Sequence, residues 1–115
     1  MTIEKGLLTG STAMLILKLL ENEDMYGYQM IEALAQRSDK TFELKSGTLY
    51  PLLHLLEKDG LICSYETNED TPRPRKYYRL RSKGRKELQK KECEWRIFSN
   101  AVEQVLRGGA VVADS

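Results

Sequence analysis

The spacing of apolar residues changes from helical to strand-like at Gly60, and this change constrains the fold strongly. Before it, four leucines lie at the i, i+3, i+4, i+7 spacing of one buried helix face. They are Leu49, Leu52, Leu53 and Leu56. After it, apolar and polar residues alternate over residues 61–66 and again over residues 75–81, as in short β-strands. Because glycine commonly ends a helix, the sequence predicts a helix over residues 46–59 followed by a β-hairpin.

Two more helices are predicted before this one, over residues 9–22 and 26–37. A polar turn at residues 22–25 separates them, and residues 38–45 are expected to be a connector with a short extended piece. Three helices followed by a hairpin form a winged helix-turn-helix, with the third helix in the recognition position and the hairpin as the wing. The predicted fold class is therefore mainly α with a small β-hairpin.

A long last helix is predicted over residues 82–107, about 39 Å at about 1.5 Å per residue. Leu88, Trp95 and Val102 lie seven residues apart in it, with Phe98 and Val105 between them, as along a coiled-coil seam. Such a helix is too long for a winged-helix body of residues 1–81. We therefore expect residues 82–107 to dimerise with a second copy, and residues 108–115 to form a flexible tail.

Apolar residues on both sides of the first helix point to the same conclusion. Met14 and Leu15 lie opposite its main apolar face, and a helix that is apolar nearly all round must be covered on two sides. A body this small can hardly cover both sides alone. The exposed side of the first helix is expected to meet the last helix of a second copy.

Positive charge is concentrated in one segment, although 18 basic and 17 acidic residues leave the whole chain at a formal charge of only +1. Residues 73–91 contain ten basic side chains and a single acidic one, Glu87. A strongly basic segment in an otherwise acidic chain usually binds phosphate, so nucleic acid is the expected partner.

Several classes of protein are disfavoured. No apolar run approaches the roughly 20 residues of a membrane span, and residues 1–10 do not resemble a signal peptide. Cys63, Cys93 and His54 are too few and too widely spaced for a zinc site, and the two thiols are expected to be reduced in the cytoplasm. No phosphate loop, nucleophile elbow or carboxylate pair is found. Tyr50 and His54 as an acid–base pair would lack a nucleophile, so no enzyme activity, metal or cofactor is expected.

Four motifs, in this order and spacing, resemble the PadR-like transcriptional regulators, in their short form with a single C-terminal helix. They are YGYQM at 26–30, SGTLYPLL at 46–53, LEKDGLI at 56–62, and RKYYRL at 75–80 followed by Lys83 and Gly84. The resemblance covers residues 6–106. Two positions depart from the family pattern. Leu55 stands where the family usually has a basic residue, and Arg81 stands where it usually has a capping threonine, so the last helix is expected to start from Ser82.

A recognition helix enters the major groove of DNA with its N-terminal residues facing base edges. With the leucines facing the core, the helix residues predicted to contact DNA are Ser46, Gly47, Thr48, Tyr50, His54 and Lys58. The wing residues expected to hold phosphates or the minor groove are Arg73, Arg75 and Lys76. Structural alternatives remain open: Ser46 or Thr48 could be a helix cap, His54 a solvated residue, and Tyr50 a residue that packs on the wing.

Trp95 is the most notable residue beyond this surface, and simple packing at a dimer interface is its ordinary role. The family resemblance implies a second role, in which two copies of Trp95 line a cavity that binds a phenolic or drug-like hydrophobic effector. The expected dimer-interface or effector residues are Met14, Leu15, Trp95, Phe98, Val102 and Val105.

The predicted function is that of a homodimeric, sequence-specific regulator, favoured as a repressor, that binds a pseudo-palindromic operator in double-stranded DNA and is released by an aromatic or hydrophobic effector. The alternative is a winged helix that binds an acidic protein partner rather than DNA.

Overall fold

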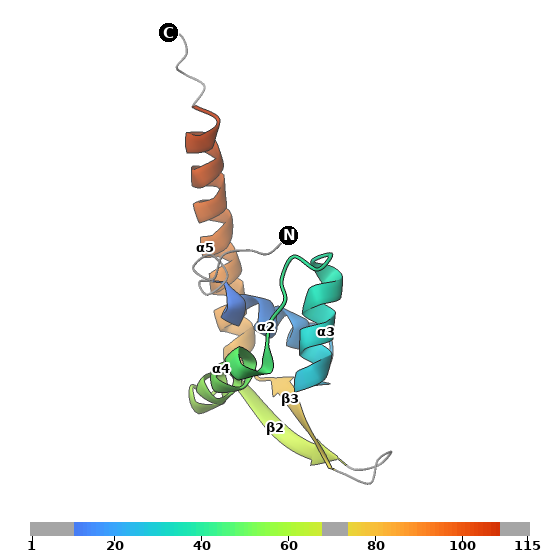
Figure 1. Ribbon diagram of the computed structural model, residues 1–115. Coiled ribbons are helices and arrows are strands. Elements are labelled where there is room, and N and C mark those ends of the chain that lie inside the picture. The colour runs from blue at the N-terminus through green and yellow to red at the C-terminus, as the bar shows by residue number, and fades with distance from the viewer. Residues whose placement is uncertain (1–10, 68–73, 109–115) are drawn as a thin grey trace.

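The computed structural model describes residues 11–67 and 74–108. Figure 1 shows a body of helices above a small sheet, with one long helix rising out of it. The elements in chain order are α2 (Thr12–Asn22), β1 (Met25–Tyr26), α3 (Gly27–Arg37), α4 (Ser46–Lys58), β2 (Ile62–Thr67), β3 (Arg75–Leu80) and α5 (Ser82–Leu106). This arrangement is a winged helix-turn-helix followed by a long helix, so the predicted fold class is confirmed.

The core of the body lies where α2, α3 and α4 meet the inner face of the sheet. Its fully buried aliphatic side chains are Ile16, Leu17, Met30, Leu49, Leu53, Ile62 and Leu88. The leucine stripe of α4 faces this core as predicted, with Leu52 only partly buried at its edge. Gly60 has a φ of +78°, the left-handed conformation that ends α4 and turns the chain into β2.

The sheet has three antiparallel strands in the order β1-β3-β2, one more than the hairpin predicted from the sequence. The added strand, β1, lies where a turn and the start of a helix were expected. It is two residues long and pairs Met25 with Tyr78 and Tyr26 with Tyr77. Two residues are too few to show an alternating pattern. The extended piece expected within residues 38–45 is not a strand.

The strand β3 places alternate side chains on opposite faces of the sheet. Tyr78 and Leu80 point into the core, whereas Arg75, Tyr77 and Arg79 lie on the outer face with Tyr65 of β2. Burial raises the pKa of the Tyr78 hydroxyl, as expected for a phenol inside the core. The outer face is therefore rich in tyrosine and arginine.

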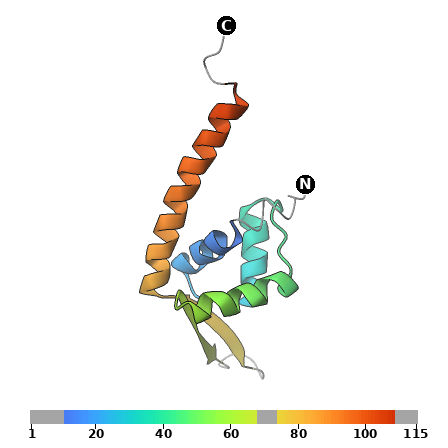
Figure 2. The same cartoon turned by 90° about the vertical axis from the view of Figure 1, so that its left-hand side faces the viewer.

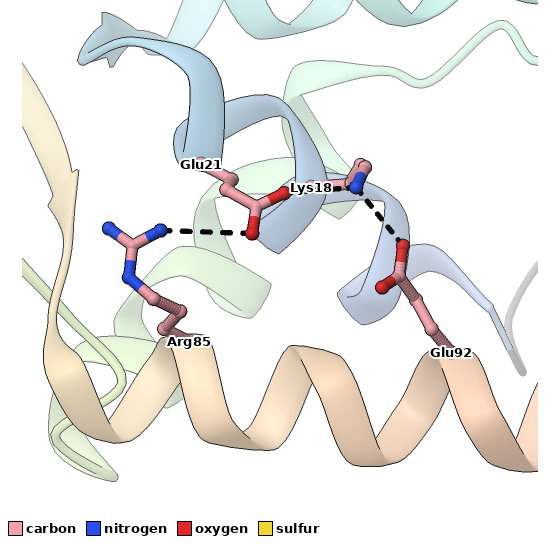
Figure 3. A network of polar contacts seen from close by, with 4 residues as sticks. All are labelled: Lys18, Glu21, Arg85 and Glu92. Atoms are coloured by element: carbon pink, nitrogen blue, oxygen red, sulfur yellow. Dashed lines mark hydrogen bonds and ion pairs between the residues drawn. The ribbon is translucent and has the colours of Figure 1, made fainter.

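The first half of α5 packs on the body, and the second half extends away from it (Figures 1 and 2). Leu88 is fully buried, and Lys18 of α2 reaches Glu92 across 3.2 Å while Arg85 reaches Glu21 across 3.7 Å. Figure 3 shows these contacts bridging the two helices. One side of α2 is thus covered by the last helix of the same chain.

This packing revises the expectation that the body cannot cover both sides of α2. Met14 and Leu15 are partly buried and pack against the core of their own chain. The predicted start of this helix at residue 9 and residues 109–115 of the predicted tail lie outside the described residues. Within residues 11–67 and 74–108, no helix is long and apolar enough to span a membrane.

Candidate nucleic-acid interface

The helix residues predicted to contact DNA all lie on the solvent side of α4, opposite its leucine stripe. They are Ser46, Gly47, Thr48, Tyr50, His54 and Lys58, and all six are exposed. The helix starts after Lys45, whose carbonyl accepts hydrogen bonds from the amides of Thr48 and Leu49 at 2.9 Å. Among the described residues, no side chain caps this helix start. The capping role left open for Ser46 and Thr48 is therefore not observed, and their hydroxyls face solvent.

Tyr50 packs against the start of α3. A Cβ atom at Gly27 would lie 2.2 Å from the Tyr50 hydroxyl oxygen, so only glycine allows the ring to lie there. Tyr50 remains 40% exposed and lines one wall of a hollow whose other walls are the first turn of α3 and the strand β3. Tyr50 therefore lies between the recognition helix, the start of α3 and the strand β3.

Two of the three predicted wing contacts, Arg75 and Lys76, also line this hollow. Arg75 donates a hydrogen bond from Nη1 to the Tyr26 hydroxyl at 2.7 Å, and its guanidinium lies 4.5 Å from the centre of the Tyr26 ring. The Lys76 ammonium lies 5.6 Å from the centre of the Tyr78 ring. Arg73, the third predicted wing contact, lies outside the described residues.

The basic segment is less uniform than its composition suggests, because ion pairs with carboxylates offset three of its cations. Arg79 pairs with Asp24 at 3.1 Å, and the hydrogen bond to that carboxylate raises the pKa of Arg79. Arg85 pairs with Glu21, and Lys91 with Glu87. Over the described parts of the chain, neither Arg75 nor Lys76 has a carboxylate within ion-pair distance. These two cations, neither of them in an ion pair with a described residue, lie at the loop end of the wing, where Lys76 is opposite Glu66 of β2.

A row of three tyrosines crosses the outer face of the sheet, and sequence reasoning missed it. Tyr77 lies edge-on to Tyr26 with ring centres 5.4 Å apart and stacks on Tyr65 at 5.7 Å. The row ends at Asp24, which accepts a hydrogen bond from the Tyr65 hydroxyl at 2.6 Å and raises the pKa of that tyrosine. The pairing of Tyr65 with Tyr77 could have been found from the hairpin register. The position of Tyr26 could not, because β1 has no sequence signal.

The residues expected at a dimer interface or effector site are only partly brought together. Trp95 and Phe98 are exposed on α5 with ring centres 6.1 Å apart, and Val102 and Val105 follow on the same exposed half of the helix. Met14 and Leu15 lie on α2, where they are partly buried and pack against the body core.

A winged-helix fold with an exposed recognition helix and cations on the wing is the usual form of a DNA-binding regulator. Residues 16–90 match the transcriptional regulator PadR-like family. The chain belongs to this family. It is accordingly a DNA-binding transcriptional regulator and not an enzyme.

Several known proteins are similar to the chain over most of its length. "Uncharacterized protein X" of Lysinibacillus sphaericus is 28% identical over 106 residues, which are 92% of this chain and 97% of the relative. A transcriptional regulator of Clostridium thermocellum has a TM-score of 0.82 at 31% identity, covering 87% of this chain and 97% of the other. A PadR family regulator of Eggerthella lenta has a TM-score of 0.78 at 35% identity, covering 88% and 86% of the two chains.

Proposed function

We propose that two copies of this chain bind a pseudo-palindromic DNA operator together and act as a sequence-specific repressor. One observation carries the DNA-binding part. Tyr50, on the exposed side of α4, lines the same hollow as Arg75 and Lys76 of the wing, two cations that form no ion pair among the described residues. In this arrangement α4 enters the major groove, while the wing holds the phosphate backbone. The protein works in the cytoplasm, where its DNA lies.

Base readout is assigned to the first turns of α4. The hydroxyls of Ser46 and Thr48 and the imidazole of His54 are exposed and can donate to or accept from base edges. Gly47 has open space where a Cβ would be, so the backbone can approach the DNA closely. Lys58, the last residue of α4, is assigned a phosphate contact. These groups supply specificity, whereas the wing cations supply affinity that depends on salt.

The exposed half of α5 supports assembly through residues 82–107. Its large apolar side chains are Trp95, Ile97, Phe98, Val102, Val105 and Leu106, and each is at least 37% exposed. An apolar helix face of this size usually marks a surface that binds another protein. A second copy presents the same seam, so the two helices can bury one another. Two α4 helices would then reach half-sites about 34 Å apart, one turn of DNA.

Release by a small ligand is the remaining part of the proposal. The rings of Trp95 and Phe98 are exposed and tilted by 37° to one another, which leaves aromatic faces available for a flat hydrophobic molecule. Such an effector would bind one relative orientation of the two subunits better than another and would shift the spacing of the two α4 helices. Repression would end when that spacing no longer matches the operator.

Fluorescence anisotropy with two duplexes tests the proposed function: one selected by the protein from a random pool, the other a scrambled sequence. We expect Thr48→Ala and His54→Ala to weaken binding to the selected duplex by about tenfold each, since a good base contact contributes about 1–3 kcal/mol. Binding to the scrambled duplex should stay unchanged. The control is Lys90→Ala, an exposed cation on α5 away from α4. Equal losses on both duplexes would contradict base readout.

Failure of the pool to enrich any duplex would contradict sequence-specific binding altogether. If the protein also captured an acidic partner protein through the wing under those conditions, the chain would instead be an interaction module. Addition of flat aromatic compounds to the complex with the selected duplex tests release, and the Trp95→Ala variant should no longer respond to them.

A further inference from the structure

We propose that the hollow between α3, α4 and the wing is a seat for one backbone phosphate of the DNA, and that Tyr26 positions Arg75 in it. The inference rests on the proposed function and names a binding site within it. The hollow has a volume of about 510 Å³ and lies where the first turn of α3, Tyr50 of α4 and the strand β3 meet. A site of this kind would fix how deeply α4 enters the groove.

The lining of the hollow is suited to an anion. Arg75 and Lys76 supply two positive charges, and the hydroxyls of Tyr26 and Tyr50 add polar groups. Within the described residues no carboxylate lines it. The one acidic side chain on α3 is Glu32, whose negative charge raises the pKa of Tyr28 at the rim. Phosphate oxygens accept hydrogen bonds from guanidinium, ammonium and phenol donors alike.

The start of α3 adds backbone donors to these side chains. The first amides of a helix have no partner inside the helix, and the helix dipole favours a negative charge beside them. Gly27 is the first residue of α3 and lines the hollow. Because it has no Cβ, the Tyr50 ring can lie against it, so that Tyr50 and the helix start face the same space. The anion site therefore combines two cations, two phenols and a helix start.

Tyr26 holds Arg75 without cancelling its charge. The Arg75 guanidinium donates to the Tyr26 hydroxyl at 2.7 Å and also lies over the Tyr26 ring. Tyr26 is in turn fixed, because its backbone amide donates to the Gln29 side chain at 3.1 Å. Arg79, on the same strand and the same face, is held by the carboxylate of Asp24 instead. The two arginines therefore differ in available charge, and Arg75 is the one left for phosphate.

The seat also lies next to the residues assigned to base readout. Tyr50 and His54 are four residues apart on α4 and so lie on the same side of the helix. A phosphate held at Tyr50 would set the register of α4 along the duplex, which is the usual effect of backbone contacts. The seat thus links the wing to the recognition helix.

The experiment measures binding to a short duplex by anisotropy over a range of salt concentrations. Arg75→Ala should reduce the slope of log K against log salt by about one, as the loss of one phosphate contact does. Arg79→Ala is the matched control, with the same charge removed from the same strand, and should change the slope by less than half as much. Lys76→Ala and Tyr50→Phe should weaken binding equally for selected and scrambled duplexes.

A double-mutant cycle tests the positioning role of Tyr26. Tyr26→Phe keeps the ring and removes only the hydroxyl, and should weaken DNA binding by about threefold to tenfold, since a hydrogen bond to a charged group is lost. In the Arg75→Ala background the same change should have no further effect. A purely structural role for Tyr26 would instead weaken binding in both backgrounds and would overturn the positioning assignment. Circular dichroism melting verifies that each variant folds.

The outcomes distinguish a failure of the phosphate seat from a failure of the proposed function. If the unchanged protein binds no DNA, the proposed function fails and the seat fails with it. If it binds DNA with a steep salt dependence that Arg75→Ala leaves intact, only the seat is wrong. Calorimetric titration with inorganic phosphate at constant ionic strength measures whether the hollow binds free phosphate. Saturable binding that Arg75→Ala abolishes would assign the hollow to a free anion and overturn its assignment to the DNA backbone.

Discussion

The two halves of α5 share one heptad pattern but have opposite environments. Leu88, in the first half, is 0% exposed and packs in the core of its own chain. Trp95 and Val102, seven and fourteen residues further along, are 48% and 37% exposed. The heptad seam is therefore divided between two kinds of packing. Its first position packs in the core of its own chain, and under the proposed dimer its later positions pack on a second copy.

Close packing and ion pairs explain where the division falls. A Cβ at Gly84 would lie 2.1 Å from the carbonyl oxygen of Leu61, so glycine lets the start of α5 lie directly on the chain that enters β2. The pairs Lys18–Glu92 and Glu21–Arg85 bridge α2 and α5 over the next turns (Figure 3). Beyond these contacts α5 leaves the body. The dimerisation helix was expected to begin at residue 82. The part of α5 that packs on the body, however, extends about three turns beyond that residue.

Replacing Leu88 should have the largest effect and tests the first half of the comparison. Leu88→Ala leaves a cavity in the core and should lower the free energy of unfolding by about 2–5 kcal/mol. Urea denaturation followed by circular dichroism measures this change. The loss should be the same at all protein concentrations, because the contact lies within one chain. Ile97→Ala, in the exposed half and off the seam, is the control and should stay within about 0.5 kcal/mol. A small loss for Leu88→Ala would show that α5 is not part of the body.

Replacing Trp95 tests the second half. If two copies associate through this half, Trp95→Ala should weaken their association by about 2 kcal/mol or more, as truncation of a central interface tryptophan does. Analytical ultracentrifugation measures the dissociation constant directly. The body should keep its fold, since Trp95 is outside the core. Ile97→Ala is the matched control because Ile97 is exposed on the same half but off the seam. Equal weakening by both variants would argue against the heptad as the interface.

Much of this fold could be predicted from local patterns. The leucine stripe of α4 and the glycine after it specify the helix, its buried face and its end, because burial and backbone freedom act over a few residues. The exposed face of α4 follows from the buried one. The same reasoning could not find β1, since two residues carry no periodicity and pair only through the register of a distant strand.

The candidate site was harder to predict because its electrostatics depend on distant pairs. The sequence shows a basic run, but not that Asp24 would offset Arg79 from 55 residues away while Tyr26 holds Arg75. Both partners come from the segment between α2 and α3, which the sequence describes only as a turn and a helix start. The number of cations can therefore be counted from the sequence, but only the fold shows which of them are paired with carboxylates.

The smallest expected effect concerns the ion pairs that hold α5 on α2. Lys18 donates to Glu21 at 2.9 Å and lies 3.2 Å from Glu92, and these hydrogen bonds raise the pKa of the Lys18 ammonium. A raised pKa in the folded state stabilises the fold at pH values below the ordinary lysine pKa. This stabilisation is lost as the pH rises through the folded pKa. Because the side chain is exposed, its contribution is small at any pH.

The test compares the Tm of the unchanged protein with that of Lys18→Met, which keeps the length of the side chain without its charge. The variant should melt slightly lower at about pH 8, and the difference should shrink at about pH 11, where lysines lose their protons. Lys86→Met is the control, since Lys86 is exposed on α5 and has no ion pair among the described residues. It should show no such pH dependence. A difference that persists at about pH 11 would mean that Lys18 supports α5 through packing of its aliphatic stem rather than through its charge.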